Sequence, residues 1–153
     1  AMYNLENDSS IWLSSGIVQP LSRKAVLTFL TNTKNNIYKE RQLRLAIETK
    51  TQKQTVGFVD LFNFSPRHLR AEIGIGILNQ FRRHGYAAEA LQLIEDYASD
   101  VLFIHQLYAF VLNRNYVAKR LFCNSGYEEV CCIKDWNKAK EGYDSVVFFQ
   151  KIL

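Results

Sequence analysis

The sequence predicts an α/β fold, a layered sandwich in which helices pack around one mixed sheet. Three observations predict it. Several short segments alternate apolar and polar residues with the period of a strand, and one long segment has the period of a helix. These segments follow one another in mixed order, which favours one layered sheet. With 153 residues, two prolines and no glycine- or serine-rich linker, the chain reads as a single domain over residues 1–153.

The elements follow from these periods. Residues 3–40 read as helical and irregular, and Ser22 is placed to cap a helix carrying Ala25, Val26, Phe29 and Leu30. Three strands are expected next, over 43–47, 56–64 and 71–78, the first two forming a hairpin across the polar turn Lys50–Lys53. The remaining expected elements are a helix over 85–102 with Ala87, Leu91, Ile94, Ala98 and Val101 on one face, a strand over 107–111, a helix over 115–124, and strands over 127–134 and 145–151.

Composition narrows the classes of function. Ten Phe, eight Tyr and 48% hydrophobic residues are ample for one packed core. A net charge of +4 spread along the chain, without a basic stripe, argues against a nucleic-acid partner. No apolar run reaches about 18 residues, so no membrane span is expected. The three histidines show no ligand spacing with the cysteines, so no metal is expected. The odd set Cys123, Cys131 and Cys132 is typical of reduced thiols, which favours the cytoplasm.

The third strand has an unusual face. Ile73, Ile75 and Ile77 alternate with Glu72, Gly74, Gly76 and Leu78, so one face is β-branched and the other carries two glycines and a carboxylate. Glycine in a strand often marks the close approach of a ligand or of other backbone. Two interpretations stay open: a ligand lies on this face, or a bulge or tightly packed helix does.

An anion site is expected directly after this strand. Arg82-Arg83-His84-Gly85-Tyr86-Ala87 opens the long helix, and a helix N-terminus offers unpaired N–H groups and a positive dipole end. Gly85 and Ala87 let backbone approach phosphate oxygens, and the arginines add bidentate charge. The loop is not a Walker A motif, because Gly-Lys-Ser/Thr is absent. It is not a dinucleotide fingerprint either, because Gly74–Asn79 lacks the third glycine.

The pattern Arg82-x-x-Gly85-x-Ala87, after a strand and opening a helix, resembles the pyrophosphate loop of the GNAT family of N-acetyltransferases. A second stretch resembles the family's other signature: Val111–Asn115, then Ala118, Leu121, Phe122 and Gly126-Tyr127. The resemblance covers residues 40–151. The segment from Gly57 through His68 to Glu72 is most similar to the spermidine/diamine acetyltransferase branch, with the ribosomal-protein acetyltransferases nearby.

The resemblance implies a mixed sheet splayed between the family's fourth and fifth strands, with acetyl-CoA in the wedge. It implies coenzyme binding by three groups of residues: strand backbone for the pantetheine arm, loop N–H groups for the pyrophosphate, and the following helix. These are Ile75, Gly76, Ile77 and Leu78; Arg82, Arg83, His84, Gly85, Tyr86 and Ala87; and Asn115, Ala118 and Phe122.

The implied reaction is direct attack of an amine on the thioester, without an acyl-enzyme. The amine needs a base, and Glu72 is the candidate, acting through water. Its alternative is an ordinary exposed or salt-bridged strand residue. The developing oxyanion needs an N–H donor, expected near Leu78.

The sequence departs from the family pattern in two places. Phe122 occupies the position where many members have a tyrosine that protonates the leaving thiolate, although a thiol of pKa about 8.5 leaves without help more readily than an alcohol does. The family's first strand is also missing, because Met2–Asn7 leads almost directly into Ile11-Trp12 and the chain reads as starting inside the first helix. The missing edge strand favours a homodimer that covers the sheet edge.

The expected acceptor is the primary amine of a small, polyamine-like molecule. Asp60, on a strand face with Val56, Phe58, Phe62 and Phe64, either binds a cation or is a paired polar residue beside the core. Two other functions stay open. One is a peptide or ribosomal-protein N-terminal acetyltransferase, and the other is a catalytically weak acyl-CoA-binding sensor, which Phe122 favours and Glu72 opposes.

Overall fold

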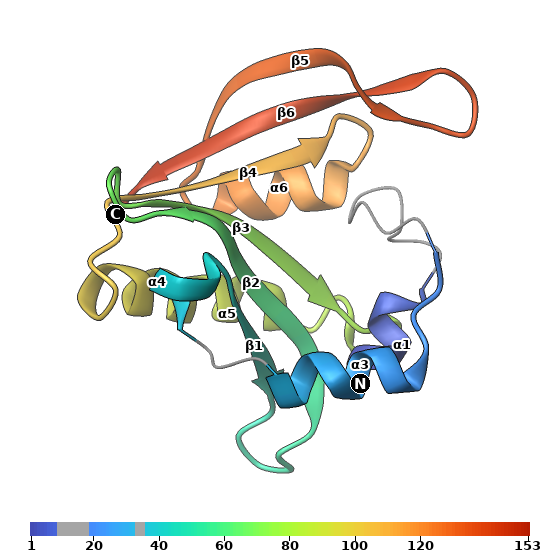
Figure 1. The fold of residues 1–153 in the computed structure, drawn as a ribbon. Helices are drawn as coiled ribbons and strands as arrows, with labels where there is room; N and C mark the ends of the chain where they lie inside the picture. Colours follow the sequence, from blue (N-terminus) through green and yellow to red (C-terminus); the bar gives the residue numbers. More distant parts are fainter. Residues whose placement is uncertain (9–18, 33–35) are drawn as a thin grey trace.

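The computed structural model describes residues 1–8, 19–32 and 36–153. Its centre is a six-stranded mixed sheet of order β1-β2-β3-β4-β6-β5 (Figure 1). The strands are β1 (Leu43–Glu48), β2 (Thr55–Ser65), β3 (Arg70–Ile77), β4 (Gln106–Leu112), β5 (Glu128–Lys138) and β6 (Tyr143–Ile152). The predicted α/β class with one mixed sheet is therefore confirmed.

The helices also follow the sequence. They are α1 (Met2–Glu6), α3 (Arg23–Asn32), α4 (Ile37–Glu40), α5 (Tyr86–Asp100) and α6 (Tyr116–Asn124). Ser22 caps α3 as predicted, because its hydroxyl accepts a hydrogen bond from the Ala25 N–H at 3.1 Å. α1 begins at Met2, and Ile11 and Trp12 lie outside the described residues. No described helix is long and apolar enough to cross a membrane.

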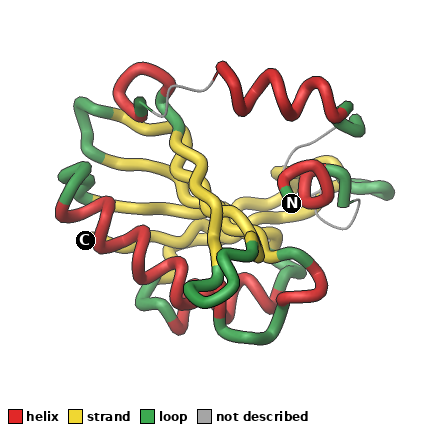
Figure 2. Tube along the Cα trace, turned by 90° about the horizontal axis from the view of Figure 1, so that it is seen from below, coloured by secondary structure: helices red, strands yellow, loops and turns green. Residues whose placement is uncertain are grey.

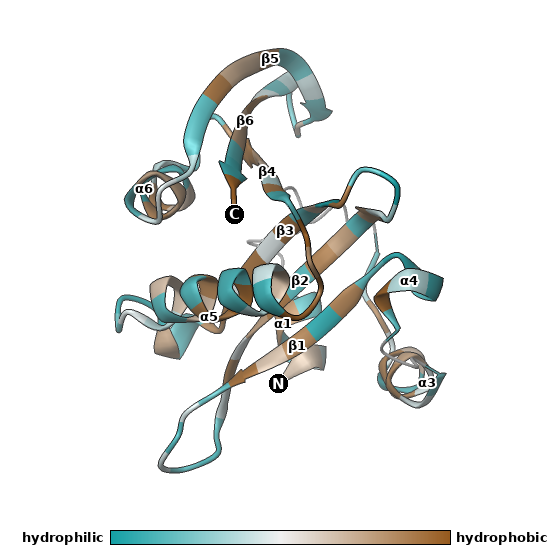
Figure 3. Cartoon of the chain, turned by 90° about the vertical axis from the view of Figure 1, so that its left-hand side faces the viewer, coloured by the Kyte–Doolittle hydropathy of each residue, from teal (hydrophilic) through white to brown (hydrophobic). Residues whose placement is uncertain are grey.

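Helices cover the two faces of the sheet unequally (Figure 3). α5 and α6 lie on one face, where the main core joins Leu91 and Ile94 of α5 and Phe122 of α6 to the strands. On the other face α1 and α3 cover only the end of β2 and β3, through a small cluster of Met2, Leu5, Val26, Phe58 and Leu78. Among the described residues, no helix covers the part of this second face that β4, β6 and β5 form.

The sheet splits in its middle. β3 and β4 run parallel but are paired only at Arg70↔Gln106, Ala71↔Leu107 and Glu72↔Tyr108. After Glu72 the two strands diverge. Figure 1 shows β3 and β4 moving apart toward their C-terminal ends, and in Figure 2 the strands run in clearly different directions. The splay that the resemblance implied is present, and it leaves the remaining edge of β3 without a strand partner.

Two details of the predicted faces are wrong. The sequence placed Phe64 on the face of Asp60, but the chain bulges at Asn63, where φ is +51° and the pairing register shifts. Phe64 therefore packs on the opposite face, in the main core. Val101 lies beyond the end of α5 and is 55% exposed, whereas the buried face of the helix includes Glu95, which is 3% exposed.

Candidate active site

A cleft of about 1890 Å³ follows the split in the sheet. It is lined by β2 and the free part of β3, by the loop that opens α5, by β4 and α6, and by part of α1 and the β5 strand. Most of the residues expected to bind a coenzyme line it, as does Glu72. Leu78 and His84 are not in the lining, although each is adjacent in sequence to a residue that is.

The Arg82–Ala87 loop has the geometry of an anion site. Gly85 forms the N-cap of α5 at φ +83° and provides no side-chain cap, and a Cβ at this position would meet open space. Among the described residues, the N–H groups from Arg83 to Ala87 have no hydrogen-bond partner, whereas that of Ala88 donates to Gly85. The Arg82 side chain is held against the end of β3, because its Nε donates a hydrogen bond to the Ile77 carbonyl at 3.0 Å. The loop thus offers free donors beside two exposed arginines.

The edge of β3 narrows the choice of an oxyanion donor near Leu78. The Leu78 N–H donates to the Val56 carbonyl at 2.9 Å, so it is not free for a ligand. In an antiparallel ladder the residues bonded to one neighbour alternate with residues that point away from it. The N–H groups of Ile75 and Ile77 therefore point away from β2, toward the side from which β4 has departed.

The two strand glycines are explained by packing inside the protein. A Cβ on Gly76 would lie 3.2 Å from a methyl carbon of Leu5 in α1, and a Cβ on Gly74 would lie 3.2 Å from the Phe62 ring. Of the two interpretations of this face, tight packing of a helix holds at Gly76. The contact brings α1 close to β3 and so sets the depth of the cleft there.

Glu72 stands where the strands separate. Its carboxylate is half-buried and accepts a hydrogen bond from the Asn63 side-chain amide at 2.9 Å. Burial raises the pKa of Glu72, and the Asn63 hydrogen bond partly opposes that rise. Its neighbour across the strand pairing is Tyr108, whose pKa is raised by burial and then by the Glu72 charge. No salt bridge binds Glu72 among the described residues, so a carboxylate with a raised pKa faces the cleft.

Asp60 turns out to be a paired polar residue. Arg44 of β1 donates two hydrogen bonds to the Asp60 carboxylate, from Nε to Oδ1 at 2.6 Å and from Nη2 to Oδ2 at 2.9 Å. Nη1 of the same guanidinium binds Glu6 of α1. One arginine therefore ties α1 to the sheet and neutralises part of the charge of two cleft carboxylates.

α6 presents the other predicted residues. The Asn115 side chain caps the helix by accepting the Ala118 N–H at 3.1 Å. Phe122 is 4% exposed and its ring packs against Tyr127, at 5.0 Å between centroids, and against Phe149, at 5.9 Å. Burial and the adjacent Glu95 raise the pKa of Tyr127, which does not line the cleft. Tyr127 is therefore not positioned to replace the missing tyrosine.

Aromatic rings form the wall of the cleft opposite α1. Phe110 of β4 stacks on Trp136 of β5, with ring centroids 6.1 Å apart and planes 17° apart, and both line the cleft. Tyr108 and Phe148 continue the cluster outside the lining. The sequence did not reveal this wall, because it joins two strands that are adjacent only through β6.

Comparison with known proteins agrees with this geometry. Residues 1–128 match the family model described as the acetyltransferase (GNAT) domain. The chain belongs to the GNAT acetyltransferase family. The resemblance seen in the sequence is thereby confirmed, and with it the splayed-sheet fold.

Relatives within the GNAT family are distant. The uncharacterized N-acetyltransferase YoaA of Bacillus subtilis (strain 168) is 27% identical over 128 residues, which are 83% of this chain and 65% of that protein. The spermidine N(1)-acetyltransferase of Vibrio cholerae is 27% identical over 128 residues, covering 84% of this chain and 72% of that protein. The chain thus spans just under two thirds of the length of YoaA.

Solved GNAT structures share the fold. Spermidine N-acetyltransferase from Vibrio cholerae in complex with CoA and spermine has a TM-score of 0.86 at 24% identity, covering 99% of this chain and 87% of that chain. A dodecameric structure of the V. cholerae enzyme in an intermediate state has a TM-score of 0.80 at 24% identity, covering 99% and 85%.

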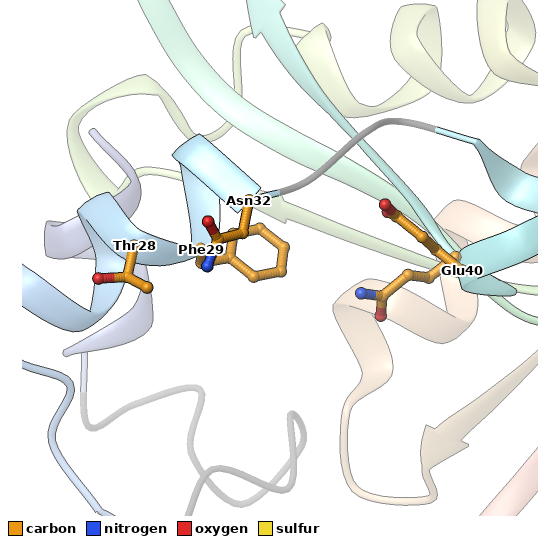
Figure 4. A pocket seen from close by; sticks show the side chains of 5 residues that line it. Thr28, Phe29, Asn32 and Glu40 are labelled. Atoms are coloured by element: carbon orange, nitrogen blue, oxygen red, sulfur yellow. The ribbon is translucent and has the colours of Figure 1, made fainter.

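Other parts of the described GNAT chain offer less chemistry. A hollow of about 300 Å³ lies between α3 and the start of β1, with Phe29 and Asn32 on one side and Glu40 on the other (Figure 4). No group of three His, Cys, Asp or Glu side chains in the described residues could hold a metal ion. The large cleft is therefore the candidate active site.

Proposed function

We propose that this chain transfers an acetyl group from acetyl-CoA to the primary amine of a small, polyamine-like molecule, by direct attack in a ternary complex. One observation carries the proposal. The sheet splits immediately after Glu72, so a half-buried carboxylate lies at the narrow end of a wedge whose wide end carries the Arg82–Ala87 loop with its unpaired N–H groups. If the loop binds the pyrophosphate of acetyl-CoA, the thioester at the other end of the coenzyme would lie near Glu72, where the amine binds.

The coenzyme half of the proposal assigns each group of residues a task. The free N–H groups from Arg83 to Ala87 bind the pyrophosphate, and Arg82 and Arg83 add charge. The free edge of β3 at Ile75, Gly76 and Ile77 pairs with the pantetheine arm as a strand would, and Leu78 lies at the end of this edge. Asn115, Ala118 and Phe122 of α6 form the opposite wall.

The amine half has Glu72 as general base. Its raised pKa makes it a better proton acceptor near neutral pH than an exposed glutamate. The Ile75 N–H replaces that of Leu78 as the proposed oxyanion donor, because it points into the wedge and is not used by β2. Proton transfer to Glu72, directly or through water, leaves a neutral amine to attack the thioester carbonyl. The tetrahedral intermediate then expels the CoA thiolate, and the excess proton on the nitrogen passes through water to the thiolate or to solvent.

Supporting details come from the relatives and from the thiols. The V. cholerae relatives are named for spermidine, and a dodecameric form of one is known, so polyamine-like substrates and self-association are both reasonable for this chain. A homodimer, covering the β1 edge, stays part of the proposal.

The exposed free thiols Cys123, Cys131 and Cys132 suit a reducing compartment such as the cytoplasm.

The test combines binding with turnover. Acetyl-CoA at 100 times its dissociation constant stabilises the folded chain by about 2.7 kcal/mol, a rise in Tm of roughly 5 to 10 °C for a domain of this size. Release of free thiol should then require an added amine from a panel of polyamines, aminoglycosides and peptides. A thermal shift without thiol release from any amine would favour an acyl-CoA sensor, and release only with peptides would favour an N-terminal acetyltransferase.

Changing Phe122 to tyrosine tests the missing acid. The substitution is expected to leave kcat unchanged or raised, because the thiolate leaves without a proton donor at this position. Steady-state kinetics with a melting curve as control measure it, since a buried hydroxyl costs about 1 to 3 kcal/mol if it finds no partner. A large drop in kcat at unchanged Tm would mean that another acid organises the site.

A further inference from the structure

We propose that the faces of Phe110 and Trp136 form a second cation subsite in the amine half of the cleft, which holds the distal ammonium of a diamine-type acceptor. The inference rests on the proposed function and narrows its substrate class. It assigns recognition of the second charge to aromatic rings and not to carboxylates.

The two rings are available to a ligand. Trp136 is 57% exposed and Phe110 is 37% exposed, although both line the cleft that Glu72 also lines. The two ring planes are 17° apart and the centroids 6.1 Å apart, so the rings lie nearly parallel within the cleft lining. The negative face of an aromatic ring attracts an ammonium group, most strongly at tryptophan.

The strand register places this surface within reach of Glu72. Tyr108 pairs with Glu72 across β3 and β4, and alternate residues of a strand share a face. Phe110, two residues further along β4, therefore lies on the same face, about 7 Å further along the strand. An amine at Glu72 can thus extend a short methylene chain along β4 and bring a second nitrogen to Phe110 and Trp136.

The charges in the cleft explain why aromatic rings take this task. The carboxylates in the lining are Glu6, Asp60 and Glu72. Arg44 binds both Glu6 and Asp60, so each of these carboxylates already has a cationic partner, and the three groups together keep one net negative charge. Glu72 is left for the reacting amine. Near the aromatic wall, Arg114 is paired with Asp144 at 2.7 Å, which limits its repulsion of a second cation.

Matched amines distinguish a cation subsite from a merely apolar wall. Butane-1,4-diamine and butylamine share one reacting amine and four carbons, but only the diamine carries a second charge. Trp136→Leu keeps an apolar side chain and removes the aromatic face. We expect it to raise KM for the diamine, relative to that for butylamine, by about 2- to 30-fold. Trp136→Phe keeps a ring and should give a smaller rise.

Two further measurements complete the design. Tyr143→Leu removes another exposed aromatic ring from the same hairpin, outside the cleft lining, and should leave both KM values unchanged. Calorimetric titration of both amines into CoA-saturated protein should give the same diamine-selective loss for Trp136→Leu without turnover. Equal losses for both amines, or none, would overturn the cation subsite. A wild-type protein that acetylates no amine would instead overturn the proposed function.

Discussion

Replacing Glu72 by glutamine is expected to lower kcat by about 10²- to 10⁴-fold, the usual contribution of a general base. Glutamine is nearly isosteric and can still form a hydrogen bond with Asn63, so Tm should change little. Steady-state thiol release over a range of pH measures the loss. Full turnover by the variant would contradict the role of Glu72, and Glu48→Gln, an exposed carboxylate on the edge strand β1, is the matched control.

The pH profile gives the same prediction a second readout. A base works in its deprotonated form, so kcat/KM should fall as pH drops through the pKa of Glu72, which burial raises above its ordinary value. The Asn63 amide stabilises the charged form of Glu72. Asn63→Ala should therefore raise this pKa further and move the acidic limb to higher pH. A limb that stays in place would mean that another group controls it.

Changing Lys151 to methionine is expected to destabilise the fold by about 3 to 5 kcal/mol, because it leaves a buried carboxylate without its partner. Lys151 Nζ lies 2.6 Å from Glu95, whose side chain is 4% exposed, and donates to the Ser125 carbonyl at 2.8 Å. The lysine thus joins α5, β6 and the end of α6. Urea unfolding at neutral pH measures the change in the free energy of unfolding.

A double-mutant cycle separates this pair from simple loss of packing. Glu95→Leu with Lys151→Met replaces both charges by apolar groups and should recover most of the lost stability. Because Lys151 also contacts Ser125 at the end of α6, the single variant should raise KM for acetyl-CoA as well. Equal destabilisation by the single and the double variant would mean that the ion pair is not the cause.

Local chemistry was readable in the sequence. The loop from Arg82 to Ala87 and the helix that follows it are adjacent in the chain, so the unpaired N–H groups at the start of this helix were expected from the sequence. The cap at Ser22 was likewise expected, because it depends on a contact over three residues, whereas the similar cap at Asn115 was not predicted. Periodicity also found each strand and long helix to within a few residues, because burial of one face imposes that period.

Contacts between distant segments were not readable. The pairing of Asp60 with Arg44 needs the register of β1 on β2, and the bond between Asn63 and Glu72 needs the bulge at Asn63. That same bulge moved Phe64 to the other face, because one extra residue reverses every later side chain. Sequence alone could not place the bulge, since a strand with and without it has nearly the same composition.

The family and the order of elements followed from local sequence patterns, and so did the choice of the Arg82–Ala87 loop and Glu72 as candidate site residues. These depend on residues close together in the chain, whose spacing a single helix or strand converts directly into geometry. Only the tertiary structure decided which carboxylates are free in the cleft, which N–H groups of β3 face the wedge, and that Phe110 and Trp136 form one wall. Each of these depends on strand pairing and splay, which join residues that are far apart in the sequence.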